Sequence, residues 1–119
     1  SGVLLWAGWA NVGTALDAAG QRFTLPNIPA IALLDILLAG ATAGLADTYA
    51  ARATVVLKRA AINGTIAIEG TPAVTVIKDD AGAAAPAFSV FGTGADSYLN
   101  IHLDGMQFNA TIVASLCQV

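Results

Sequence analysis

The sequence predicts an all-β protein: an antiparallel β-sandwich or jelly-roll-like fold of eight or nine short strands. Two observations carry this prediction. Apolar and polar residues alternate with period two along most segments, as in strands that have one buried face. Turn-forming dipeptides and Gly/Pro clusters also recur at short intervals, which is typical of antiparallel all-β folds and not of parallel βαβ units.

The N-terminal segment, Ser1–Gly20, is expected to supply either a first strand or an N-terminal arm of a single domain spanning residues 1–119. Both tryptophans of the chain lie here, Trp6 and Trp9. They could pack on the core, or they could dock on a neighbouring subunit, since Trp is favoured in interface anchors. The candidate interface residues are Val3, Leu4, Leu5, Trp6 and Trp9.

The next segment, residues 30–39, reads AIALLDILLA and has high helix propensity. We interpret it as a strand because Pro and Gly bound it and because the later segments alternate with period two. The dipeptide Asn63–Gly64 predicts a hairpin between strands at 49–61 and 65–69. Further short strands are predicted at 21–25, 73–78 and 87–91.

The clearest alternation runs from Tyr98 to Leu116 and predicts a closing hairpin. Its two strands would be joined by Asp104–Gly105, a dipeptide that tolerates the positive φ angles of a type I′ turn. His102 falls on its polar face. The apolar face is expected to carry Leu99, Ile101, Leu103, Phe108, Ala110, Ile112, Ala114 and Leu116.

The composition is unusually poor in charge. The chain of 119 residues is 56% hydrophobic and 11% charged, against about 25% charged residues in a typical domain. A domain of this size exposes much surface, so we expect copies of the same chain or other subunits to cover part of it. The net charge of −3, with no Lys/Arg cluster beyond Lys58–Arg59, argues against nucleic acid as a partner.

The segment Ile28–Ala46 is rich in Ile, Leu and Ala, which makes it a candidate membrane span. Pro29 lies near its start, and Asp35 lies close to its centre, where a carboxylate costs about 2.5–3.5 kcal/mol on insertion scales. The segment is therefore interpreted as a buried strand, and a membrane is not expected as a partner.

The sequence offers few groups for catalysis. Cys117 and His102 form the only available nucleophilic pair, and no cationic residues surround the cysteine to lower the pKa of its thiol. The spacing Gly92–Thr93–Gly94 lacks the third glycine of a dinucleotide-binding turn. We therefore expect no enzymatic activity, no catalytic residues and no cofactor.

A metal site is not expected either. Asp79–Asp80 could join Asp96 or Asp104 in a calcium site, but the spacing does not match the twelve-residue calcium loop, and turn-forming Asp explains these positions better. Lys58 and Arg59 are expected to form a solvated strand end.

Three segments of the second half carry a resemblance: ARATVVLKRAAINGT, GTPAVTVIKDDAGAAAPAFSV and ADSYLNIHLDGMQFNATIVASL. Over about residues 50–117 the chain resembles small β-sandwich structural modules of tailed-bacteriophage virions, of the decoration, fibre and appendage type. The resemblance implies a virion location and a structural role, without any receptor-contacting residue that can be transferred.

The sequence therefore predicts a bacteriophage virion structural protein. The preferred interpretation is a capsid decoration (cement) protein that stabilises the head by packing between subunits. The class suggests a homotrimer, with the major capsid protein or tail proteins as further partners. The alternatives are a tail fibre or tail-tip component, which could bind a receptor, and a self-assembling filament subunit.

Overall fold

The structure is a computed structural model that describes residues 3–10, 27–80, 82, 85–103 and 105–118. These residues form seven strands and two short 3-10 helices, with no α-helix among them. In chain order the elements are β1 (Val3–Ala10), β2 (Ala30–Ala41), η1 (Ala43–Leu45), β3 (Thr48–Arg59), β4 (Ile66–Asp79), β5 (Ala87–Phe91), η2 (Gly94–Asp96), β6 (Tyr98–His102) and β7 (Gln107–Gln118).

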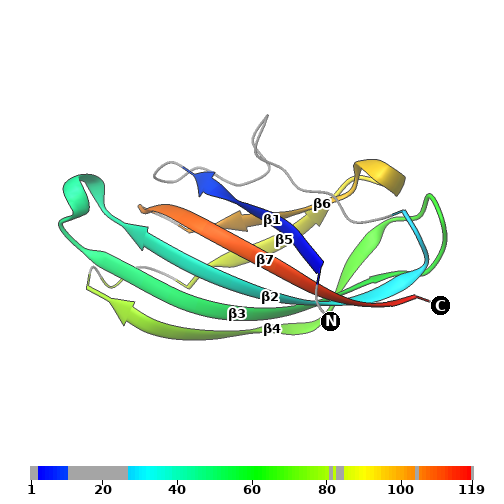
Figure 1. The fold of residues 1–119 in the computed structure, drawn as a ribbon, viewed down its shortest axis with the longest axis horizontal. Coiled ribbons are helices and arrows are strands. Elements are labelled where there is room, and N and C mark those ends of the chain that lie inside the picture. Colours follow the sequence, from blue (N-terminus) through cyan, green and yellow to red (C-terminus); the bar gives the residue numbers. More distant parts are fainter. Residues whose placement is uncertain (1–2, 11–26, 81, 83–84, 104, 119) are drawn as a thin grey trace.

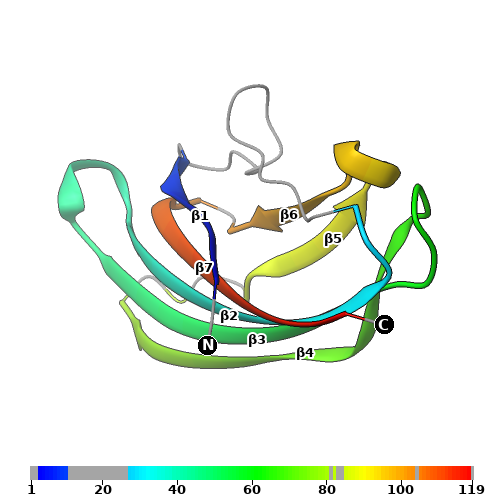
Figure 2. The ribbon, with the colours of Figure 1, turned by 45° about the vertical axis from the view of Figure 1, so that its right-hand side comes forward.

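The strands form two sheets of unequal size. The larger has five strands in the order β1-β7-β2-β3-β4, and the smaller is the two-stranded ribbon β5–β6 (Figure 1). All pairings within them are antiparallel. The large sheet curves, and the ribbon lies over its concave side (Figure 2). The prediction of an all-β, antiparallel protein is confirmed, while the finer class of sandwich or jelly roll stays a prediction.

The described residues hold seven strands instead of the eight or nine predicted, and β4 accounts for part of the difference. Two strands at 65–69 and 73–78 were expected, separated by Gly70–Thr71–Pro72. The structure has one continuous strand there, whose register shifts so that Glu69 pairs with Val56 while Ala73 pairs with Thr54. The intervening residues form a bulge, which accommodates a proline without ending a strand. The predicted strand at 21–25 lies outside the described residues.

The core lies between the large sheet and the ribbon. Along β2 every second side chain is buried, which confirms the strand at 30–39 and rules out the helix that propensity alone favoured. The same alternation buries one face of β3 and of β7. The inward side chains of these strands and of the ribbon form one cluster, which includes Leu34, Ile36, Tyr49, Val55, Leu57, Leu99, Ile101, Phe108 and Ile112.

The hairpin predicted from Tyr98 to Leu116 is wrong, because its two strands do not pair with each other. β6 pairs with β5 in the ribbon, whereas β7 pairs with β1 and β2 in the large sheet. The chain therefore passes from one sheet to the other, and Leu103 and Met106, on the two sides of this connection, are both buried. The predicted apolar face is nevertheless buried, apart from the half-buried Leu116, because both arrangements turn it toward the same core.

The hairpin predicted at Asn63–Gly64 is confirmed. β3 and β4 pair on either side of it, and Asn63 has a φ of 62°. The turn is tied to the chain ahead of β2, because Asn27 donates to Asn63 Oδ1 and accepts from its backbone N–H, both at 2.8 Å. Within the described part of the chain, no helix is long and apolar enough to cross a membrane.

Candidate functional site

The side of the large sheet that faces away from the ribbon is the candidate site, and we call it the outer face. It is formed by the alternate residues that β2, β3 and β7 do not bury. Their register places them side by side across the three strands. The outer face consists of Ile31, Leu33, Asp35, Leu37 and Ala39 of β2, Ala50, Arg52, Thr54, Val56 and Lys58 of β3, and Asn109, Thr111, Val113, Ser115 and Cys117 of β7.

The middle strand of the outer face is mostly aliphatic. Ile31, Leu33 and Leu37 are 43%, 45% and 47% exposed, so nearly half of each side chain is accessible to solvent. Single exposed aliphatic residues are common on protein surfaces, but several on one face of a strand, here interrupted only by Asp35, point to an interaction surface. The prediction of a buried strand was therefore right for one face of β2 only.

The charges of the outer face are paired within the chain. Arg52 donates from Nε to Asp35 Oδ1 at 3.2 Å and from Nη2 to Asp35 Oδ2 at 3.3 Å. At the edge of the face, Lys58 Nζ lies 3.7 Å from Oε1 of Glu69 on β4. Exposed pairs of this kind contribute only about 0–1 kcal/mol to stability. Their consequence here is that an aliphatic surface carries no net charge.

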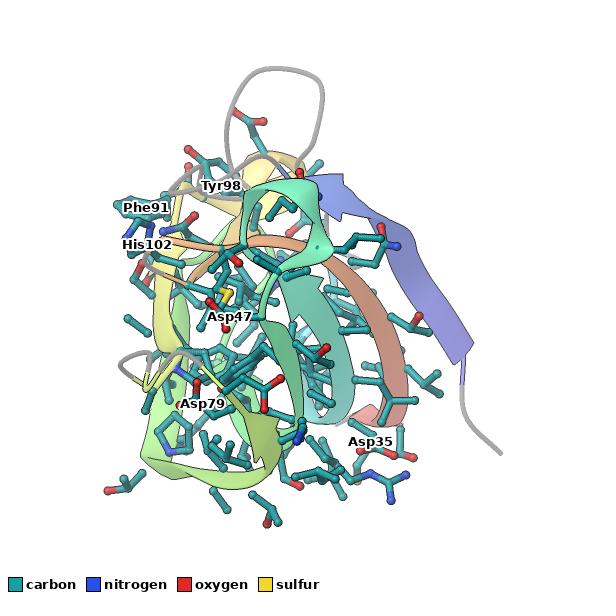
Figure 3. All side chains as sticks on the ribbon, turned by 90° about the vertical axis from the view of Figure 1, so that its left-hand side faces the viewer. Asp35, Asp47, Asp79, Phe91, Tyr98 and His102 are labelled. Atoms are coloured by element: carbon teal, nitrogen blue, oxygen red, sulfur yellow. The ribbon has the colours of Figure 1, made fainter. Side chains whose placement is uncertain are left out.

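A shallow hollow lies at the centre of the outer face, around the pair of Asp35 and Arg52. Figure 3 shows Asp35 on the side of β2 that points away from the ribbon. The rest of the hollow is lined by side chains of all three strands: Leu33, Thr54, Val113 and Ser115. It is a depression in a surface and not an enclosed pocket, which suits contact with another protein better than binding of a small molecule.

A second surface lies on the ribbon. The rings of Phe91 and Tyr98 stack with their centroids 5.7 Å apart. Further along the same face, Asn100 Nδ2 donates to Ser89 Oγ at 3.4 Å, and Figure 3 shows His102 on the side of Phe91 and Tyr98. The predicted polar face of residues 98–102 is therefore a mixed aromatic and polar surface.

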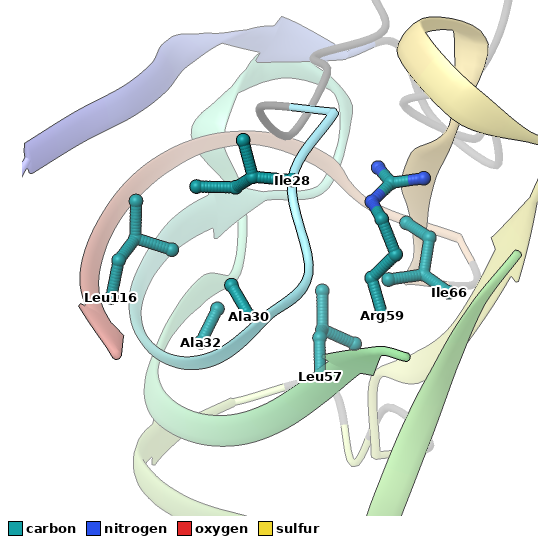
Figure 4. Close-up of a pocket in the computed structure, with 7 residues that line it drawn as sticks. All are labelled: Ile28, Ala30, Ala32, Leu57, Arg59, Ile66 and Leu116. Carbon is teal, nitrogen blue, oxygen red and sulfur yellow. The ribbon is translucent and has the colours of Figure 1, made fainter. Parts of the chain in front are cut away.

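One end of the core holds a buried arginine. Arg59 is 3% exposed and donates to the carbonyl of Gly64 at 2.6 Å and to Ser97 Oγ at 2.7 Å. The prediction that Lys58 and Arg59 both form a solvated strand end is wrong for Arg59. The cavity beside it, lined mainly by aliphatic side chains (Figure 4), measures about 10 Å³. That is room for about one water molecule and not for a substrate.

The groups weighed for catalysis do not come together in one sheet. His102 lies in the ribbon opposite Ala87, while Cys117 lies in the large sheet opposite Ile31, where it is exposed. The predicted hairpin would have placed His102 and Cys117 on adjacent strands, but the structure does not form it. No group of three or more His, Cys, Asp or Glu side chains that could hold a metal ion occurs among the described residues.

The pair Asp79–Asp80 ends β4. Asp80 accepts from the backbone N–H of Thr48 at 3.1 Å and lies 2.8 Å from Lys78 Nζ. The contact with Lys78, and to a lesser degree the hydrogen bond from Thr48, lower the pKa of the Asp80 carboxyl. The same ion pair raises the pKa of Lys78. Asp80 thus closes the end of the sheet, as turn-forming Asp was expected to do. Asp104 lies outside the described residues.

The candidate interface residues Val3, Leu4, Leu5, Trp6 and Trp9 all fall on β1. This strand pairs with β7 and forms one edge of the large sheet. Its side chains lie outside the described part of the structure, so their role as an interface stays a prediction. The outer face was missed from the sequence, although the apolar residues on both sides of β2 were a visible signal for it.

No protein-family model matches the chain, and no curated protein matches it either. Among solved structures, it is similar to the tailspike protein of Acinetobacter baumannii phage AM24, with a TM-score of 0.44 and 9% sequence identity. The match covers 95% of this chain and 26% of the tailspike chain, so this chain spans about a quarter of that protein's length. A likeness at this level carries no argument about function.

Proposed function

We propose that this chain is a structural component of a tailed-bacteriophage virion, without enzymatic activity, which works by packing against other proteins. Its preferred role is that of a capsid decoration protein that stabilises the head. The observation that carries the proposal is the outer face, a sheet surface with a row of half-exposed aliphatic side chains on β2 and with its charged side chains paired within the chain. Such a surface gains free energy when another protein covers it, at about 25 cal/mol per Å² of apolar area.

The location in a virion comes from the resemblance of residues 50–117 to phage structural modules. A decoration protein bridges neighbouring capsid subunits, and each new contact adds association free energy that opposes the internal pressure of a packed head. The partners proposed are copies of this chain and the major capsid protein or tail proteins. The class suggests a homotrimer, and the edge strand β1 with Trp6 and Trp9 is a further candidate contact.

The alternative is a tail fibre or tail-tip component that binds a receptor. The stacked rings of Phe91 and Tyr98, beside Asn100 and His102, favour it, because aromatic faces with adjacent polar groups suit receptor recognition. Substituting Phe91 by Ala would weaken adsorption to host cells if the ribbon is the binding surface, while a decoration protein would tolerate this substitution.

Electron cryomicroscopy of purified particles that contain the tagged chain tests the proposed function. Density for the tag on the head lattice supports decoration, whereas density at the tail supports the alternative. Particles that lack the chain altogether would contradict any virion role. As a functional readout, heads from which a decoration protein is omitted should release their DNA at lower temperature than complete heads.

A further inference from the structure

We propose that the outer face is covered by the outer face of a second copy of this chain, in a two-fold contact centred on Asp35 and Arg52. This inference rests on the proposed function, because it names the surface and the partner through which the chain packs. Three properties of the outer face lead to it: its size, its charge pattern and the shape of its centre.

The size fits a contact between two proteins. β2, β3 and β7 have 12 residues each. Strands of this length, about 4.8 Å apart, give a face of about 40 by 14 Å, or about 560 Å² per copy. Specific, stable interfaces begin at about 1,200 Å² summed over both partners, so two outer faces, about 1,120 Å² together, lie just below that range and fit a weak, reversible contact.

The charge pattern is self-complementary. Asp35 and Arg52 lie on neighbouring strands, where the register places Arg52 opposite Leu37, the next outward residue after Asp35. A two-fold axis that lies between the two copies, parallel to their sheets and perpendicular to the line from Asp35 to Arg52, sets the carboxylate of each copy against the guanidinium of the other. Asp35 of each copy then meets Arg52 of the other, as a two-fold interface requires. An anionic membrane or a strongly charged partner would gain nothing from a neutral face.

The shape of the centre favours a pair over a trimer. The sheet curves away from its outer face at both ends (Figure 2), so contact between two copies concentrates on the central residues. There the hollow around Asp35 and Arg52 can receive Leu37 of the partner. A three-fold axis along β2 would instead bring three Asp35 carboxylates toward one line, where like charges repel. The outer face therefore favours a dimer in place of the trimer that the class suggests.

Sedimentation velocity of the full chain, from about 1 to about 100 μM, tests the inference, because an interface below the standard size is expected to be weak and to dissociate at micromolar concentrations. The wild type should pass from monomer to dimer over this range. Leu33→Glu and Val113→Glu should each raise the dissociation constant at least about tenfold, since no basic residue lies opposite either position in the sheet to pair with the buried carboxylate. Ile62→Glu is the matched control, because Ile62 is 63% exposed in the β3–β4 turn, away from the outer face.

A charge-reversal experiment tests the pairing itself. Asp35→Arg and Arg52→Asp should each abolish the dimer, because each variant brings like charges together across the axis. A mixture of the two variants should restore it, since one copy is then doubly basic and the other doubly acidic at the centre. Circular dichroism of each variant confirms that it folds; substitutions at these half-exposed positions should leave the spectrum unchanged.

Three outcomes would overturn the inference: a wild type that stays monomeric at about 100 μM, a dimer that the Glu substitutions leave intact, or a trimer. A mixture of the charge variants that fails to associate also counts against it. These results are separable from the proposed function. A monomer found in virions would overturn the dimer alone, and a dimer absent from virions would overturn the virion role alone.

Discussion

The guanidinium of Arg59 donates a 2.7 Å hydrogen bond to the hydroxyl of Ser97, a residue 38 positions away in sequence. Both side chains are buried, and Ser97 in turn donates to the carbonyl of Gly94. This contact joins the end of β3 in the large sheet to the turn that leads into β6 in the ribbon. A charged side chain thus helps to hold the two layers together at one end of the core.

Ser97→Ala should destabilise the protein by about 1–3 kcal/mol, because it leaves a donor of the buried Arg59 guanidinium without its partner. Urea unfolding at neutral pH measures the loss. Lys58→Met is the matched control, since Lys58 is the adjacent cation but lies exposed beside Glu69. The control should change stability by less than about 0.5 kcal/mol. Equal effects of the two substitutions would contradict the role given to Ser97.

Tyr49→Phe should stabilise the protein by about 1 kcal/mol. Tyr49 is 1% exposed, and within the described part of the chain its hydroxyl has no hydrogen-bond partner. Burial, and to a lesser degree the nearby Asp79 carboxylate, raise the pKa of its phenol above the ordinary value of 10.0. The unfolded chain therefore ionises first, and the wild type should lose stability as the pH rises through about 10.

The Tyr49→Phe variant should lack this alkaline loss. Free energies of unfolding at about pH 8 and about pH 10.5 for both proteins provide the check. Equal alkaline losses in wild type and variant would show that other groups cause the effect. A variant that is less stable at neutral pH would show that the hydroxyl does have a partner.

Gly92→Ala should destabilise the protein more than its backbone angle alone explains. Gly92 has a φ of 83°, and a Cβ there would lie 2.0 Å from the backbone oxygen of Asp96, across the tight η2 turn. Gly70→Ala is the matched control, because its φ is 70° and a Cβ would meet nothing within 4 Å. The control should cost about 1–2 kcal/mol. If thermal melts show the two variants equally stable, the close approach at Gly92 is wrong.

Leu45→Asn should stabilise the protein by about 0.5–1 kcal/mol, because Asn tolerates the left-handed conformation better than Leu does. Leu45 has a φ of 60° and is 75% exposed, so the substitution removes little buried area. The turn around it is held by Thr42, whose carbonyl accepts from the Leu45 N–H at 3.0 Å and whose hydroxyl accepts from the Asp47 N–H at 3.0 Å. A lower melting temperature for the variant would show that Leu45 makes a stabilising contact.

Alternation in the sequence predicted which side chains face the core but not which strands pair. Leu99 and Phe108 are buried as expected, yet they lie in different sheets. A hairpin and a crossing between two layers bury the same set of residues, so the pattern cannot distinguish them. Pairing depends on contacts between distant segments, such as β5 with β6 and β7 with β2, and these leave no local mark on the sequence.

The burial of Arg59 was visible in the sequence pattern, but the prediction gave more weight to its charge. It has the same parity as Leu57 and Val55, so alternation along β3 places it in the core. Its charge suggested a solvated strand end instead. The outer face was not predicted because β2 has apolar residues on both sides, which suggested that both sides are buried. Only one side is covered within this chain.

The position of β7 has a consequence for how the protein is made. β7 lies between β1 and β2 in the large sheet, so the first described strand reaches the rest of the sheet only through the last one, which is synthesised about a hundred residues later. The ribosome must therefore deliver residues up to Gln118 before the sheet can close, and until then the apolar sides of β2 lie open to chaperones and to other nascent chains.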